Sequence, residues 1–263
     1  MLLEVRNVYK NFGGVHAGQD VSLSVDANQI VSLIGPNGAG KTTIFNLISG
    51  IYKLDSGSIT FNGHNLVGME PHTISSLGIA RTFQNIRLFK GLSVIDNLMA
   101  ARDPVAPYNL FSAMLKLPSC RKADHENREQ CMEFLELVGL AKYRDEDPLN
   151  LPYGLQRRVE LARALARNPR LIMLDEPAAG LNPSEVTAFI SLIQDLKHRF
   201  GFGILIIEHR MMVVNELSEY IYVLNFGKLL AHGSPEFIRN DPEVITAYLG
   251  EEVQDARNPE PQR

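Results

Sequence analysis

Apolar and polar residues alternate, or form short apolar runs, along the first third of the chain. The segments 2–12, 19–35 and 57–63 show this pattern, and Gly, Asn and Asp residues lie between them. Alternation with a period of two is typical of strands that bury one side. The first third is therefore predicted to be rich in β-strands.

The pattern changes to helical spacing between about residues 86 and 150. Segments 93–101 and 128–140 carry apolar residues three and four positions apart. Cys131 lies on the apolar face of the second segment, so we expect it in the core. Prolines interrupt the segment 103–119 between them, which predicts a loop with a short helix.

Strand patterns return after residue 170 and alternate with helical patterns. The segments 171–176, 202–209 and 221–227 are apolar runs, and helical spacing occurs at 157–168 and 184–198. This alternation predicts an α/β fold with a parallel sheet. The helical segments between about 86 and 150 are then an insertion within an α/β core.

Composition narrows the class of protein. The 263 residues are enough for one large domain or two small ones, and 45% hydrophobic residues support a real core. The net charge of −4 does not favour nucleic acid as a partner. The N-terminus does not have the pattern of a signal peptide, and no apolar stretch approaches the ~18 residues that span a bilayer. The tail 251–263 is polar and contains prolines, so we expect it to be disordered.

One Gly-rich segment joins an apolar run to a helical pattern. It fits Gly35-x4-Gly40-Lys41-Thr42, the phosphate-binding pattern of P-loop nucleotidases. Small residues let backbone N–H groups surround a phosphate, and the start of the following helix favours anions. Lys41 can reach the β- and γ-phosphates, and the Thr42 hydroxyl can ligate Mg²⁺. The strand and helix patterns on either side favour this interpretation over a plain turn with an exposed lysine.

Two carboxylates end the apolar run 171–174. Ligands of open α/β sheets bind beyond the carboxyl ends of the strands. Asp175 would therefore face Mg²⁺, and Glu176 could polarise the attacking water. We expect separate roles because successive side chains on a strand point apart. The alternative is a pair of exposed carboxylates at a strand end.

A histidine follows the apolar run 204–207. The end of a third strand would bring His209 to the same sheet edge, where an imidazole can hydrogen-bond the γ-phosphate and the attacking water. A lone histidine is more often structural or exposed, and the strand context favours the site.

The segment 151–170 begins with Pro and Gly and continues as a helix. Val159, Ala162 and Ala166 are expected to face inward. Four basic residues are expected to form a solvated, partly ion-paired face: Arg157, Arg158, Arg163 and Arg167.

The order of these motifs resembles the ATP-binding subunits of ABC transporters, over nearly all of residues 1–250. The motifs are GPNGAGKTT at 35–43, Gln84 in RTFQNIRLF, LPYGLQRR at 151–158, LDEPAAGLNP at 174–183 and IIEH at 206–209. Within that superfamily, RTFQNIRLF, YGLQRRVELARAL, EPAAGLNP and the closing ITAYLG resemble the ATPases of branched-chain amino acid importers. Lipopolysaccharide-export ATPases share several of these segments.

The resemblance implies an ABC ATPase domain over residues 1–250. It consists of a P-loop nucleotidase core, an antiparallel β subdomain and a helical subdomain inserted at about 86–168. The implied cofactors are ATP and Mg²⁺. Nine residues would bind the phosphates: Gly35, Pro36, Asn37, Gly38, Ala39, Gly40, Lys41, Thr42 and Thr43. Asp175, Glu176 and His209 would be the metal-side carboxylate, the general base and the phosphate-sensing switch.

Further roles come from the resemblance alone. Phe12 would stack on adenine, and a core strand residue is the alternative. Gln84 would contact Mg²⁺ and the attacking water, and its loop would sense the permease. Tyr153 and Gly154 belong to the signature loop, which in this family closes on ATP held by the facing subunit. Two ATP molecules would then lie between two such subunits.

The signature loop departs from the usual Leu-Ser-Gly-Gly-Gln, since residues 151–155 lack its serine and glutamine. Proline is tolerated in the first turn of a helix. We therefore expect Pro152 to begin a helix that continues through Arg167. The N–H groups of Tyr153, Gly154 and Leu155 would replace the serine hydroxyl as donors to the facing γ-phosphate. The chain also has asparagine at 182 and arginine at 210, where the family often has aspartate.

These inferences predict an ATP hydrolase that powers a membrane importer from the cytosolic face of the inner membrane, for branched-chain or related amino acids. Its partners would be membrane-spanning permease subunits, an identical or related second ATPase subunit and, indirectly, a periplasmic or extracellular substrate-binding protein. No nucleic acid partner is expected.

Three alternatives remain open. An exporter ATPase, such as one for lipopolysaccharide, performs the same chemistry for another cargo. A soluble ABC ATPase of translation or DNA repair usually has a fused second unit or long coiled coils, and this chain has neither pattern. A P-loop kinase would need an acceptor pocket and a lid, and LPYG followed by Asp175-Glu176 argues against it.

Overall fold

The computed structural model describes residues 1–102 and 118–248. The loop expected at 103–119 lies almost entirely outside the described residues, and the tail 251–263 lies entirely outside them.

The strands are β1 (Leu3–Phe12), β2 (Val15–Val25), β3 (Ile30–Ile34), β4 (Ser56–Phe61), β5 (His64–Asn65), β6 (Ile79–Arg81), β7 (Leu171–Asp175), β8 (Gly203–Ile207), β9 (Tyr220–Asn225) and β10 (Lys228–Gly233). The helices are α1 (Lys41–Ile48), α2 (Pro71–Ser76), α3 (Val94–Arg102), α5 (Pro118–Leu137), α6 (Tyr153–Leu165), α7 (Pro183–Phe200), α8 (Met211–Leu217) and α9 (Pro235–Arg239), with 3₁₀ turns η2 (Ala141–Tyr143) and η3 (Pro148–Asn150).

The first third of the chain forms an antiparallel sheet of order β2-β1-β4-β5. Val5 on the central strand β1 pairs with Leu23 on one side and Ile59 on the other. All three side chains are buried, as their alternation with polar neighbours predicts. The β-rich character predicted for this part of the chain is confirmed.

The second sheet has the order β10-β9-β3-β8-β7-β6. Its strands run parallel except at the β10 edge, which pairs antiparallel with β9. The predicted parallel sheet is confirmed. Because carboxyl ends of parallel strands meet at one edge, the segments after β3, β6, β7 and β8 converge there. These segments carry the candidate site.

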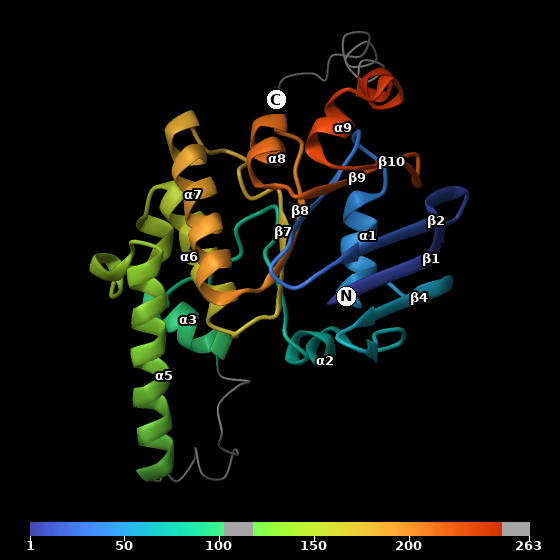
Figure 1. Ribbon diagram of the computed structural model, residues 1–263. Helices are drawn as coiled ribbons and strands as arrows, with labels where there is room; N and C mark the ends of the chain where they lie inside the picture. The colour runs from blue at the N-terminus through green and yellow to red at the C-terminus, as the bar shows by residue number, and fades with distance from the viewer. Residues whose placement is uncertain (103–117, 249–263) are drawn as a thin grey trace.

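Strand β7 separates two hydrophobic cores. Leu171 and Met173 pack with the antiparallel sheet and α1. Ile172 and Leu174 point the other way and pack with α3, α5, α6 and α7. Figure 1 shows these helices on one side of the parallel sheet and the antiparallel sheet with α1 on the other. The apolar run is continuous because both faces of the strand are covered.

The helices α3, α5 and α6 form the part of the molecule that lies farthest from the antiparallel sheet (Figure 1). Cys131 is fully buried in their core, as predicted, and burial raises the pKa of its thiol to about 11. Val159, Ala162 and Ala166 are also fully buried, which confirms the predicted inward face of α6.

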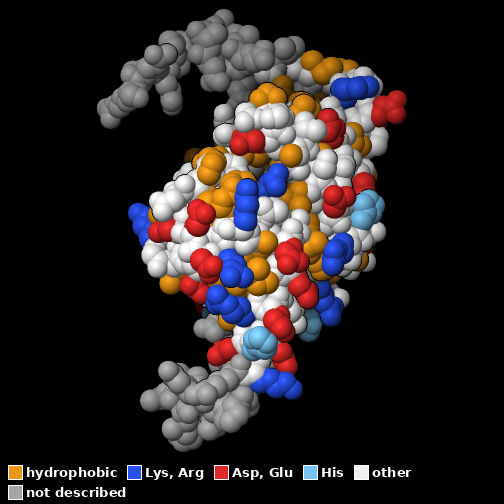
Figure 2. Space-filling model, turned by 90° about the vertical axis from the view of Figure 1, so that its left-hand side faces the viewer, with side chains coloured by type: hydrophobic (Ala, Val, Ile, Leu, Met, Phe, Trp, Pro, Cys, Tyr) orange, Lys and Arg blue, Asp and Glu red, His pale blue; other side chains and the backbone are white. Residues whose placement is uncertain are grey.

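The helical side of the molecule carries charges of both signs. Figure 2 shows Lys and Arg side chains interspersed with Asp and Glu side chains across this face. On the part of this face that the structure describes, such mixing does not form a continuous basic patch. Within residues 1–102 and 118–248, no helix combines the length and the hydropathy required to cross a bilayer.

Candidate active site

The Gly-rich loop between β3 and α1 uses backbone angles that favour glycine. Gly35 has φ 145° and Gly40 has φ 104°. A Cβ at these positions would lie 2.0 Å from the carbonyl oxygen of Leu224 and 2.3 Å from that of Ala17. Both glycines are therefore required by space as well as by conformation. The loop owes its shape to backbone that packs against it from β2 and β9.

The loop also uses one of its own predicted donors internally. The Ala39 N–H donates to the Pro36 carbonyl oxygen at 3.2 Å, so this amide is engaged within the loop. Helix α1 starts directly afterwards, with Gly40 as its N-cap. Thr42, in its first turn, is exposed. The positive end of α1 thus points to the loop, as an anion site requires.

Lys41 holds its ammonium group within the same loop. Its Nζ donates to the carbonyl oxygens of Gly35 and Pro36 at 2.6 and 2.8 Å. The residue is only 8% exposed. A largely desolvated ammonium beside a glycine loop and a helix start is well suited to bind phosphate.

Asp175 ends β7 and forms a buried ion pair that the sequence did not suggest. Arg81, at the end of the neighbouring strand β6, donates to Asp175 Oδ2 at 3.0 Å. Arg81 also donates to Asn46 Oδ1 and Ser49 Oγ on and after α1. Burial raises the pKa of Asp175, and the hydrogen bond and charge of Arg81 act in the opposite direction. Arg81 therefore ties the carboxylate to α1.

Glu176 lies beyond the end of β7, so the expectation that strand alternation separates its side chain from that of Asp175 was wrong. Strand alternation does not separate it from Asp175, because β7 ends at Asp175 and Glu176 has φ 48°. This left-handed conformation redirects the side chain, and the Glu176 N–H donates to the Ile207 carbonyl oxygen at 2.9 Å. The two carboxylates do diverge, but through a backbone turn.

Two predicted residues, each in a segment that follows a different strand, meet at Glu176. Gln84 Nε2 donates to Glu176 Oε2 at 2.9 Å. His209 Nδ1 lies 3.8 Å from Glu176 Oε1. The glutamate thus lies between an amide and an imidazole at the carboxyl edge of the sheet. A water molecule at this position would have a proton acceptor and two orienting groups.

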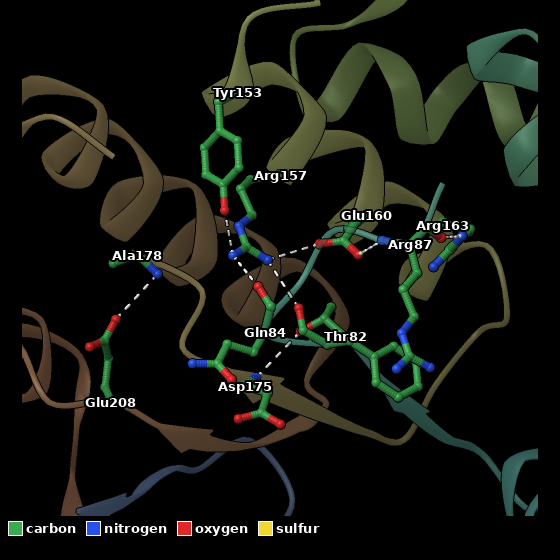
Figure 3. A network of polar contacts seen from close by, with 11 residues as sticks. Thr82, Gln84, Arg87, Tyr153, Arg157, Glu160, Arg163, Asp175, Ala178 and Glu208 are labelled. Atoms are coloured by element: carbon green, nitrogen blue, oxygen red, sulfur yellow. Dashed lines mark hydrogen bonds and ion pairs between the residues drawn. The ribbon is translucent and has the colours of Figure 1, made fainter. Parts of the chain in front are cut away.

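Glu208 is a structural residue of the site that the sequence analysis missed. Its carboxylate accepts from the N–H groups of His209 and Arg210 at 2.8 and 3.0 Å. It also accepts from the Ala178 N–H at 3.2 Å, the contact drawn in Figure 3. It is 1% exposed. Glu208 therefore joins the histidine loop to the loop after β7. Its place directly after an apolar run and before His209 was the available signal.

Phe12 lies where an exposed aromatic can meet a ligand. The ring is 41% exposed and contacts Tyr52 edge-on, with centroids 5.1 Å apart. The Lys10 ammonium lies 5.2 Å from the ring centroid. Phe12 is thus not a core strand residue, and stacking on adenine remains a prediction.

The signature segment differs from its prediction in two details. Pro152 has φ −51° and ψ 147° and is the N-cap, so the helix begins at Tyr153 and ends at Leu165 instead of Arg167. The Leu155 N–H donates to the Pro152 carbonyl oxygen at 2.9 Å and is not directed outward. This leaves the N–H groups of Tyr153 and Gly154 as the candidate outward donors.

Gly154 and Tyr153 also contact neighbouring elements. A Cβ on Gly154 would lie 2.6 Å from Oε1 of Glu185, in the first turn of α7. Glu185 and Asn182 form a capping box at this helix, which explains why asparagine serves where the family often has aspartate. The Tyr153 ring packs against Gly180. Arg210, the other departure, donates to the Leu181 carbonyl oxygen at 3.1 Å.

The predicted solvated, partly ion-paired arginine face is wrong for Arg157, which is buried although it is ion-paired with Glu160. Arg158, Arg163 and Arg167 are half-buried, and Arg158 donates to the Val138 carbonyl oxygen at 3.3 Å. Arg157 is 3% exposed and binds the Phe83 and Gln84 carbonyl oxygens, and Arg163 binds the Arg87 carbonyl oxygen (Figure 3). Arg167 donates to the Ala101 carbonyl oxygen at 3.1 Å, and burial lowers the pKa of both Arg163 and Arg167. Backbone carbonyl oxygens accept the hydrogen bonds that these guanidinium groups would otherwise make to water. Glu160, three residues after Arg157, was the signal that could have revealed an internal pair.

The residues at this edge fit a magnesium nucleotide. Mg²⁺ is usually held by one or two carboxylates together with waters and substrate phosphates. Thr42, Gln84 and Asp175 offer oxygens of three kinds near the phosphate loop. In the part of the chain that the structure describes, no group of three or more His, Cys, Asp or Glu side chains could hold a metal. Phosphate oxygens would therefore have to complete the ligand set.

A phosphate loop and a candidate general base at one edge of a parallel sheet define a P-loop nucleoside triphosphatase. Comparison with known proteins narrows this class. A family model described as "ABC transporter" matches residues 18–179. A second, described as "Branched-chain amino acid ATP-binding cassette transporter", matches residues 228–254. The chain belongs to the ABC transporter family of ATP-binding proteins.

Individual relatives agree with this assignment. The high-affinity branched-chain amino acid transport ATP-binding protein LivG of Escherichia coli K12 is 46% identical, over 95% of this chain and 98% of LivG. The lipopolysaccharide export system ATP-binding protein LptB of Haemophilus influenzae is 36% identical, over 95% of this chain and 98% of LptB. The ADP conformation of MJ1267, an ATP-binding cassette of an ABC transporter, superposes with a TM-score of 0.82 at 32% identity, covering 95% and 99% of the two chains. The predicted fold and the predicted resemblance are confirmed.

Proposed function

We propose that the chain is the ATP-hydrolysing subunit of an importer for branched-chain or related amino acids. ATP hydrolysis is supported by the position of the Glu176 carboxylate, which lies between the Gln84 amide and the His209 imidazole. This is the sheet edge at which the phosphate loop also lies. The cargo class is supported by the match at residues 228–254 and by the higher identity to LivG than to LptB. An exporter is therefore the weaker alternative.

The side chains divide the chemistry among them. Lys41 binds the β- and γ-phosphates with its ammonium, and the loop amides surround them. Glu176 accepts a proton from the attacking water, which Gln84 and His209 orient. Thr42, Gln84 and Asp175 would hold Mg²⁺, which neutralises charge on the phosphates when it is bound. Phe12 stacks on the adenine.

We further propose how the chain is organised around this site. Residues 1–250 form the ABC ATPase domain, with the helical subdomain at about 86–168. The subunit is peripheral, on the cytoplasmic face of the membrane. There it pairs with permease subunits and with a second ATPase subunit, while a substrate-binding protein delivers the amino acid on the other side. The position of α3, α5 and α6 supports this division, since together they form the part of the molecule farthest from the antiparallel sheet.

The test of this function is transport by the assembled complex. The chain is expressed with its permease subunits, purified and reconstituted in proteoliposomes. ATP on the side of this subunit should drive uptake of leucine, isoleucine or valine that depends on the binding protein. Uptake that does not depend on ATP, or export of another cargo, would overturn the proposal.

Nucleotide should also change the oligomeric state. We expect the Glu176→Gln chain to be monomeric without nucleotide and to dimerise, or to pair with a related ATPase, with ATP. The reason is that the Tyr153 and Gly154 amides at the start of α6 have their proposed phosphate partner only on a facing subunit. Light scattering with and without ATP measures this. A fully active monomer at every concentration would contradict the sandwich of two subunits.

Substitutions in the signature turn separate contact with nucleotide from contact within the subunit. Pro152→Ser should be mild, because an N-cap serine keeps the helix start. Gly154→Asp should lower the ATPase rate of the assembled transporter by about tenfold or more, because a negative charge enters the phosphate contact. The structure adds a second cause, since the new carboxylate would also meet Glu185.

A double variant resolves the two causes. Gly154→Asp combined with Glu185→Gln removes the like-charge contact with α7. If thermal stability returns and the ATPase rate stays low, the turn contacts nucleotide. Recovery of full activity would show that the defect was confined to the capping of α7.

A further inference from the structure

Arg157 joins two loops that the proposed function treats separately. Its Nη1 donates to the Phe83 carbonyl oxygen at 3.0 Å, and its Nη2 to the Gln84 carbonyl oxygen at 2.5 Å. The same Nη2 lies 2.8 Å from the Tyr153 hydroxyl, one helical turn back on α6. A single buried guanidinium thus holds the backbone of the Gln84 loop (residues 83–87) and a side chain of the signature turn (Figure 3).

Glu160 extends the attachment to the far end of the Gln84 loop. It receives Arg157 Nη1 at 3.1 Å on one oxygen and the Arg87 N–H at 3.0 Å on the other. Both side chains are almost completely buried, at 3% and 2% exposure. Buried ion pairs persist only when their remaining hydrogen-bonding capacity is used. Here the backbone of the Gln84 loop and the Tyr153 hydroxyl use the Nη donors of Arg157 and the second oxygen of Glu160, while the buried Arg157 Nε has no hydrogen-bond partner among the described residues.

Each end of this connection reaches a group with a proposed role. From the Gln84 loop, the Gln84 amide donates to Glu176. From the signature turn, the Tyr153 ring packs against Gly180 in the loop after β7. Displacement of the Gln84 loop relative to α6 would break the contacts of Arg157 with the Phe83 and Gln84 carbonyl oxygens and of Glu160 with the Arg87 N–H together.

We propose that Arg157 is a positioning residue that binds the Gln84 loop to the first turn of α6, so that both move as one unit. The inference rests on the proposed function. It states that Gln84 contacts Glu176 only when the signature turn is positioned to bind the ATP of the facing subunit. Hydrolysis in one site is thereby linked to the surface that this subunit offers to the other site.

The chemistry of arginine explains why this position needs it. The planar guanidinium presents donors in a fixed fork and can serve two carbonyl groups, a carboxylate and a hydroxyl at once. A lysine ammonium has three donors around one nitrogen and cannot reproduce that spread. Arg157→Lys should therefore behave like Arg157→Met, although it keeps the charge opposite Glu160.

Hydrogen exchange of the free chain tests the attachment without nucleotide. In Arg157→Met, exchange at the Arg87 amide should accelerate by about tenfold or more, because Glu160 loses its charged partner and the Gln84 loop opens. The matched control is Arg102→Met. Arg102 is another buried arginine of the helical part, and it donates to the Ala166 carbonyl oxygen at the other end of α6. Unchanged exchange in Arg157→Met, or equal acceleration in the control, overturns the proposal.

Turnover and dimerisation test the purpose of the unit. Arg157→Met should keep the ATP affinity of the single chain, because the phosphate loop is untouched, and should lower kcat by about tenfold or more. On the Glu176→Gln background it should raise the ATP concentration needed for dimerisation. Tyr153→Phe, which removes only the hydroxyl, should lower kcat in the wild type but not in Arg157→Met, since coupled residues are non-additive.

The outcomes distinguish this inference from the proposed function. If Glu176→Gln alone fails to dimerise and the wild-type complex fails to hydrolyse ATP, the function is wrong, whatever the exchange data show. If those controls succeed and Arg157→Met turns over like the wild type, the inference is wrong and the function stands. Full activity of Arg157→Lys would also overturn the role given to the guanidinium fork.

Discussion

Replacement of Glu176 by glutamine is expected to lower the ATPase rate by ~10²–10⁴ while ATP affinity is retained, as is usual when a general base is lost. The structure makes the substitution conservative in shape. The glutamine carbonyl can still accept from Gln84 Nε2, and the left-handed backbone at residue 176 does not change. Only the capacity to take a proton is lost.

The measurement compares nucleotide binding and turnover on the same preparation. Glu216→Gln is the control, because Glu216 is an exposed glutamate on α8, away from the sheet edge. Unchanged turnover in Glu176→Gln would place the general base elsewhere. Loss of both ATP binding and turnover would instead indicate that Glu176 maintains the structure of the nucleotide site.

Replacement of Lys41 by alanine should weaken ATP binding by about 10- to 100-fold, with turnover falling at least as far, because a desolvated charge that faces the phosphates is removed. Two effects combine at this residue. The phosphates lose a cation, and the carbonyl oxygens of Gly35 and Pro36 lose the donor that holds the loop closed.

A second buried lysine provides the control for folding. Lys197, near the end of α7, is also 8% exposed and pairs with Glu219, which directly precedes β9. Lys197→Ala should lower the melting temperature without a specific loss of nucleotide affinity. A Lys41→Ala protein that hydrolyses ATP at the normal rate would refute the assignment of the loop 35–43 to phosphate binding.

The parts of the site that sequence could predict are those attached to long apolar patterns. β3, β7 and β8 are fully buried runs, so the apolar pattern alone is enough to place their ends, and hence Lys41, Asp175 and His209, at one edge of a sheet. This prediction succeeded because the local turn chemistry and the strand topology pointed the same way.

The parts that escaped prediction are buried charges. Arg81, Arg157 and Glu208 each bind partners that are distant along the chain or belong to the backbone, and an arginine looks the same in sequence whether it faces water or a carbonyl group. Glu176 was placed correctly for an incorrect reason, since its φ of 48° depends on the contact with Ile207. These features arise from tertiary contacts, of which the local sequence gives at most a partial signal, such as Glu160 three residues after Arg157.

The equal length of the central strands has a consequence for how this chain can vary. β3, β7 and β8 each have five residues, and every one is buried. Deleting one residue from any of them would draw its terminal group back by ~3.3 Å and turn every following side chain to the opposite core. Insertions and deletions should therefore be tolerated in exposed turns such as 62–63 and 67–68, and selected against within these three strands. The number of residues in each buried strand fixes where the group at its end lies. The lengths of these strands therefore matter to the proposed chemistry as much as the side chains themselves.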